Sequence, residues 1–120
     1  MSQLIQDLKA LREFFSSSDK WTQNAIARNS AGYEVTPLDK RACSWCLVGG
    51  IEKVIGGIES RSFDNMIPFR RYETIRINLL EVSRRKKYSA LLSEVNDSSS
   101  FDQIISLIDE TILKQEALSK

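Results

Sequence analysis

The chain contains no histidine and only two cysteines among its 120 residues. Without histidine it lacks the usual general base and the cysteine–histidine pair of many thiol enzymes. A structural zinc site needs about four ligands, and two cysteines do not supply them. We therefore predict no metal site and no cofactor, and we assign no catalytic residue.

Long hydrophobic runs are also missing. No stretch approaches the roughly 18 apolar residues that a membrane span needs, and the N-terminal sequence MSQLIQDLKALREFF lacks the features of a secretory signal. The two cysteines lie three residues apart in a predicted helix, a poor arrangement for a mutual disulfide. We expect a cytoplasmic protein, working in the interior of a host cell and not in a membrane.

The chain has little net charge, only +1, but its charged residues are unevenly distributed along the sequence. Residues 60–90 hold eight basic and three acidic residues, a net charge of +5, so the remainder carries −4. The candidate binding surface consists of Arg70, Arg71, Arg76, Arg84, Arg85, Lys86 and Lys87. Clustered cations bind phosphate backbones without reading base sequence. A protein or nucleoprotein partner fits this surface equally well, and a solvated face is the alternative.

The length and the composition fit one domain, residues 1–120, with a hydrophobic content of 42% and no internal repeat or linker. We predict a mainly α fold (α+β): four to five helices around a central helix 39–55, with a small β-hairpin at about 20–36. The hairpin rests on the turn-forming cluster 29–32 between two apolar stretches. A helical turn through Ala25–Arg28 is the alternative.

The central helix is predicted from an unusual stretch that contains both cysteines, Trp45 and the pair Gly49–Gly50. Glycine inside a helix costs roughly 1 kcal/mol relative to alanine. We therefore expect another backbone or a bulky side chain to lie directly against the two glycines. Asp39 is the predicted N-cap, and Gly56–Gly57 the predicted end.

Hydrophobic periodicity predicts the other helices. They are a first helix over 3–15, a helix that starts at Pro68, a short helix over 88–95 and, after a turn over 96–100, a last helix. A capping box of Ser100 with Gln103, or the pair Ser99 and Asp102, would open the last helix. We expect its tail after Lys114 to fray.

Two motifs and a distant pair together carry a family resemblance. Residues 21–28 read W-T-Q-x-A-x-A-R, residues 42–49 read A-x-x-W-C-x-x-G, and Asn96–Asp97 precede an amphipathic helix. This pattern resembles a domain-of-unknown-function family of small bacterial and bacteriophage proteins. The motif residues that matter here are Trp21, Arg28, Trp45, Cys46, Gly49, Asn96 and Asp97. The chain departs from the pattern at Val95, where the family usually has tryptophan, and at Gly50, where alanine is usual. The resemblance implies a small, mostly helical phage-type protein and no established activity.

The candidate chemistry leaves alternatives open. Cys43 and Cys46 form a C-x-x-C pair, but Cys43 lies inside the predicted helix and not at its start, so we predict small buried residues rather than a redox pair. A Cys46 nucleophile would need a lysine, Asp97 or Glu94 to activate it. Asn96–Asp97 either orient a ligand or satisfy free amides in a turn.

Trp21 and Arg28 could stack on a base or a partner side chain. The other reading makes Trp21 a core residue and Arg28 a member of an ion pair. We favour a non-enzymatic accessory protein that binds a host or defence component, for example as an anti-CRISPR-like inhibitor. A nucleic-acid-binding regulator and a cysteine-dependent enzyme are the alternatives.

Overall fold

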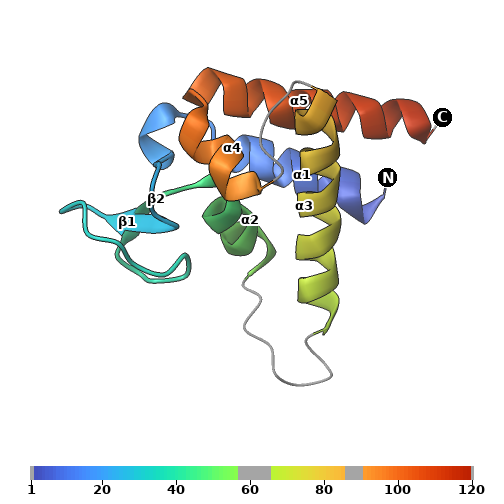
Figure 1. Ribbon diagram of the computed structural model, residues 1–120. Coiled ribbons are helices and arrows are strands. Elements are labelled where there is room, and N and C mark those ends of the chain that lie inside the picture. The colour runs from blue at the N-terminus through green and yellow to red at the C-terminus, as the bar shows by residue number, and fades with distance from the viewer. Residues whose placement is uncertain (1, 57–65, 86–90, 120) are drawn as a thin grey trace.

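The computed structural model describes residues 2–56, 66–85 and 91–119 (Figure 1). In chain order its elements are α1 (Gln3–Phe14), the 3-10 helix η1 (Ser18–Lys20), β1 (Ala27–Asn29), β2 (Ala42–Trp45), α2 (Leu47–Ile55), α3 (Met66–Arg85), α4 (Leu92–Ser98) and α5 (Phe101–Leu118). Five helices and one small antiparallel sheet in these residues confirm the predicted mainly α class.

The helices pack around a single apolar core. α1 contacts α2, α3 and α5, and α3 also packs against α2 and α5. In Figure 1, α1 and α5 run side by side, α3 crosses them, and the sheet lies at the end of the molecule opposite both termini. The largest fully buried apolar side chains are Leu8, Leu11, Phe15, Leu47, Ile51, Ile75, Leu79, Val95, Ile104, Leu107 and Ile108.

The central helix is shorter than predicted, because residues 42–45 form β2 and α2 begins only at Leu47. Asp39 does not cap the helix. Its Oδ1 accepts from Arg41 N at 2.8 Å, and its carbonyl accepts from Ala42 N at 3.0 Å, so it closes a turn before β2. A four-residue strand is too short for periodicity to distinguish it from a helical start, and its pairing partner is distant in sequence.

The sheet joins β1 to β2 in antiparallel order, with Ala27 opposite Trp45. Within the range predicted for the hairpin, 20–36, the chain does reverse direction. Gly32 makes this possible, since its φ of +87° lies in the left-handed region that glycine adopts without strain. The partner strand is nevertheless β2, outside the predicted range.

Helix ends were predicted with mixed success. Gly56 ends α2 in the left-handed conformation, and the capping box of Ser100 with Gln103 opens α5, as expected. α3 begins at Met66 and not at the predicted Pro68. Of the helix predicted over 88–95, residues 88–90 lie outside the described residues, and the helix found there is α4 at Leu92–Ser98. α5 continues through Leu118, beyond the point where fraying was expected.

Candidate functional site

The side-chain amide of Asn96, fully buried in α4, connects three segments that are far apart in the sequence. Its Oδ1 accepts hydrogen bonds from Trp21 Nε1 at 2.6 Å and from Leu47 N, the first amide of α2, at 2.9 Å. Its Nδ2 donates to Thr22 O at 3.0 Å and to Asp97 Oδ1 at 3.2 Å. These bonds use the full capacity of the amide. We call these five residues the Asn96 network.

Gln23 and Asn24 extend the contact between the segment before β1 and α4. Gln23 Nε2 donates to three carbonyls at the end of α4, those of Asn96 (3.1 Å), Asp97 (3.2 Å) and Ser99 (2.8 Å). The last carbonyls of a helix have no partner within it, so this side chain supplies one. Asn24 N donates to Asp97 Oδ1 at 2.8 Å, and its φ of 63° places it in the left-handed region.

The two sequence hypotheses for Asn96–Asp97 can now be compared. Both residues lie near the end of α4 and not in the turn that was predicted for 96–100. Each side chain accepts a hydrogen bond from a backbone amide that is distant in the sequence. The contacts of Asn96 are therefore those of the amide-satisfying alternative.

Arg28 holds the loop before and after β1 together. Its Nε donates to Thr22 Oγ1 at 3.0 Å, Nη1 to Gly32 O at 2.9 Å and Nη2 to Gln23 O at 3.1 Å. All three acceptors are neutral, so these bonds differ from the ion pair that one reading of the sequence proposed. The planar guanidinium suits such a fan of acceptors.

Both tryptophans use their indole N–H groups inside the protein. Trp21 is half-buried and bonded to Asn96, whereas Trp45 is buried and donates to Pro37 O at 2.8 Å. The Trp45 ring also meets Phe14 edge-on, with ring centroids 4.9 Å apart. Both rings thus act as packing residues.

The close approach predicted at the two glycines is confirmed. A Cβ on Gly49 would lie 2.1 Å from the carbonyl oxygen of Ile26, and a Cβ on Gly50 would lie 2.4 Å from the ring of Phe15. The Ile26 carbonyl is held there because it accepts from Cys46 N at 3.1 Å. One glycine therefore admits a backbone and the other a bulky side chain.

Cys46 is the N-cap of α2, and its sulfur accepts from Gly49 N at 3.3 Å. Burial raises the pKa of this thiol, and the amides of Gly49 and Val48 oppose that shift only in part. The carboxylates of Asp97 and Glu52 raise the pKa further. A thiol kept neutral in this way is a poor nucleophile, although a helix N-terminus alone would favour the thiolate.

The prediction of two buried cysteines within a helix was wrong for Cys43, which is exposed and lies in β2. The two cysteines should therefore differ sharply in reactivity, because Cys46 is buried. At about pH 8 we expect Cys46 to react with Ellman's reagent at least about a hundredfold more slowly than Cys43 in the native protein. Cys43→Ser and Cys46→Ser variants assign the two phases, and denaturant should equalise them. Equal native rates would contradict the burial of Cys46.

Beside the network lies a cavity of about 410 Å³, where α2, α3 and α4 meet the segment before β1. Cys46, Tyr72, Arg76 and Asp97 line it together with apolar side chains. Tyr72 follows Phe69 and precedes Ile75 at helical spacing on α3, so the sequence pattern alone indicates a packing residue and not a cavity. A tyrosine within an otherwise apolar stripe was the available signal, because its hydroxyl needs a polar neighbour or solvent.

The candidate basic surface is only partly free on α3. Arg70 is exposed, whereas Arg71 makes a bidentate contact with the buried Asp7 of α1, at 2.7 and 3.1 Å. Arg76 likewise contacts Glu73 at 2.7 and 3.1 Å, and this hydrogen bond lowers the pKa of the Glu73 carboxyl. The side chains of Arg84 and Arg85, in the last turn of α3, and the whole of Lys86 and Lys87 lie outside the described residues.

Within the described ranges, no three histidine, cysteine, aspartate or glutamate side chains gather as a metal site would require. No helix there is both long and apolar enough to cross a membrane. Comparisons of the chain with family models, curated proteins and solved structures found no match.

Proposed function

We propose that this protein is a non-enzymatic, phage-type accessory protein that acts by stoichiometric binding to a host or defence component, and that it belongs to the small bacterial and phage family that its motifs resemble. The partner is a protein or a nucleoprotein complex in the interior of the host cell. Inhibition of a defence system, as an anti-CRISPR protein does, is the form of action that we favour.

Support for a binding role comes first from how the motif residues are used. The polar groups of Trp21, Arg28 and Asn96 form hydrogen bonds within the protein. The sulfur of Cys46 caps α2 by accepting a hydrogen bond from Gly49 N, and burial raises the pKa of this thiol. Residues that would be the first candidates for chemistry are thus committed to holding the fold together.

The single observation that carries the proposal is the exposed face of α3. Phe69 is 44% exposed and Ile77 52% exposed, and Arg70 and Thr74, which lie between them in the sequence, are exposed too. Exposed apolar side chains beside an arginine are typical of protein interfaces, where aromatic residues and arginine are enriched. In the sequence, this stripe is followed by the basic run 84–87. We infer a partner with an apolar groove and an acidic rim.

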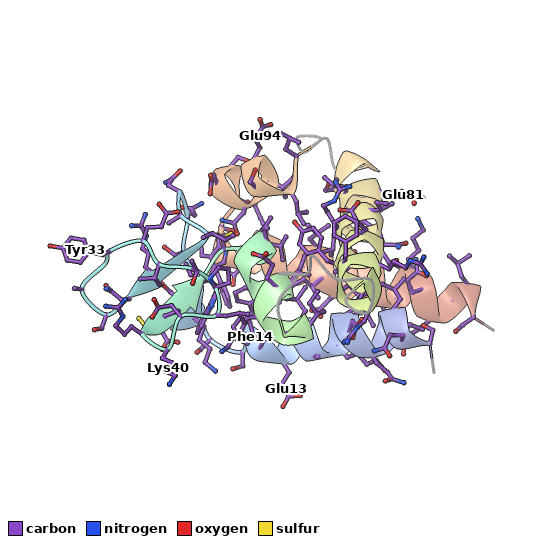
Figure 2. The ribbon with its side chains drawn as sticks, turned by 90° about the horizontal axis from the view of Figure 1, so that it is seen from below. Glu13, Phe14, Tyr33, Lys40, Glu81 and Glu94 are labelled. Atoms are coloured by element: carbon purple, nitrogen blue, oxygen red, sulfur yellow. The ribbon has the colours of Figure 1, made fainter. Side chains whose placement is uncertain are left out.

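The test is capture of a partner from host lysate by wild type and by two double variants. Arg84→Glu/Arg85→Glu should weaken capture at least about tenfold, as loss of close charge pairs does at protein interfaces. Lys40→Glu/Arg41→Glu is the matched control, with the same change of charge. Lys40 projects from the loop before β2, on the side of the molecule away from α3 (Figure 2).

The outcomes separate the alternatives. Capture that both double variants retain would show that the chosen surface is wrong. Binding to nucleic acid whose logarithm falls steeply with the logarithm of salt concentration would favour the regulator instead. The internal pairing of Arg71 and Arg76 leaves α3 fewer free cations for that role. The cysteine-enzyme alternative would be excluded if Cys46→Ser kept full activity in cells.

A further inference from the structure

The cavity beside the Asn96 network has the size of a small-molecule site. Its volume of about 410 Å³ falls within the roughly 300–1,000 Å³ typical of ligand pockets. The residues that α3 contributes to its lining are Tyr72 and Arg76, which are not members of the exposed α3 stripe that carries the proposed function.

The walls divide into an apolar and a polar part. Ile26, Val48 and Leu92 provide the apolar part, and the polar part consists of Cys46, Tyr72, Arg76, Ser93 and Asp97. A few convergent polar groups on an apolar wall are the usual composition of a site that orients an organic ligand.

Several of the polar groups have bonding capacity left over. Within the described part of the chain, the Tyr72 hydroxyl has no hydrogen-bond partner, and Asp97 uses Oδ1, not Oδ2, for Asn24 N and Asn96 Nδ2. Arg76 gives Nε and Nη2 to Glu73, which leaves its Nη1. The cavity therefore offers at least one free carboxylate oxygen and two free donors.

Two groups on the cavity wall, the Tyr72 hydroxyl and the Cys46 thiol, have pKa values raised above their ordinary values. Burial raises the pKa of Tyr72, and the Glu52 carboxylate raises it further by more than Arg76 lowers it. Asp97 and Glu52 act in the same direction on the pKa of Cys46, after burial. Both groups therefore stay protonated.

We propose that this cavity binds a small neutral or cationic organic molecule with an apolar body and an N–H-bearing end, an amine or an amide. The N–H end donates to Asp97 Oδ2, a carbonyl on the ligand accepts from Tyr72 or Arg76, and the apolar body lies against Ile26, Val48 and Leu92. A carboxylate of the same shape binds more weakly, because its negative charge would lie against the carboxylate of Asp97.

Three matched probes test the proposal on the full chain: phenethylamine, 3-phenylpropanamide and 3-phenylpropionate. We expect the amine and the amide to produce saturable ¹⁵N chemical-shift changes, with dissociation constants of about 1–10 mM for ligands of this size. The largest changes should be at Val48, Tyr72 and Leu92. The carboxylate should bind at least about tenfold more weakly. Absence of saturable changes with all three, or equal binding of the carboxylate, would overturn the proposal.

A filled cavity provides the location control. Val48→Trp should abolish the shifts, whereas Leu113→Trp, on the exposed face of α5, should leave them unchanged. If Val48→Trp does not fold, labelling of Cys46 in a Cys43→Ser background gives the same information. Saturating amide should slow that labelling at least about threefold, since a bound ligand covers the sulfur. Unchanged labelling would place the probes elsewhere and refute the site.

Discussion

Replacement of Asn96 by alanine is expected to lower the free energy of unfolding by about 4 kcal/mol, because it leaves one buried and two partly buried groups without partners at about 1–3 kcal/mol each. Those groups are Leu47 N, Trp21 Nε1 and Thr22 O. Domains are stable by only about 5–15 kcal/mol, so the variant should be close to unfolding.

Urea denaturation followed by tryptophan fluorescence measures this loss. Asn78→Ala is the matched control, since Asn78 also bonds through its amide, donating to Thr74 O and accepting from Gln115 at the edge of α3. Because those groups are partly exposed to water, we expect the control to cost at most about 1 kcal/mol. A cost for Asn96→Ala no larger than that of the control would show that solvent can replace the network.

The second large effect concerns Gly49, where Gly49→Ala should destabilise the fold by about 3 kcal/mol, at the upper end of overpacking costs. In an exposed helix the same change would instead stabilise by about 1 kcal/mol. The sign reverses because the new Cβ would lie 2.1 Å from the Ile26 carbonyl oxygen, a backbone atom in the hydrogen bond to Cys46 N. Thermal and urea unfolding of the purified variant measure the change.

Gly50 gives an internal comparison, because there the obstacle is a side chain. Gly50→Ala would place its Cβ 2.4 Å from the end of the Phe15 ring. Phe15→Leu shortens that side chain, so the double variant should recover at least about 1 kcal/mol relative to additivity, as coupled neighbours do. The pair Gly49→Ala/Phe15→Leu should show no such recovery. Equal behaviour of the two glycines would contradict the different contacts seen here.

Sequence alone predicted the features that depend on local spacing. Periodic apolar residues located α1, α3 and α5, and the cost of glycine in a helix led to the contacts at Gly49 and Gly50. The start of α2 was wrong for an equally local reason. Its N-cap is Cys46, which is outside the usual set of serine, threonine, aspartate and asparagine, while Asp39 offered a false signal.

The site was only half predictable. The motif residues were identified, but the partners of Asn96 lie 49 and 75 residues away, where no spacing rule applies. The Glu73–Arg76 ion pair can be predicted from the sequence, because the two residues are i, i+3 neighbours on a helix. The Arg71–Asp7 ion pair joins two helices that are distant in the sequence, so no local pattern predicts it. The cavity arises from four segments packed together, so it has no signature in any one of them.

The long sequence separations in the Asn96 network also have a consequence for biosynthesis. Trp21 and Gln23 bond to residues 73–76 positions later. While the nascent chain is still attached to the ribosome, the donors of Trp21 and Gln23 therefore lack their native acceptors until α4 has been translated. Small domains of this kind complete folding as a unit rather than piece by piece. The first third of this polypeptide reaches its final conformation only after most of the remainder has emerged.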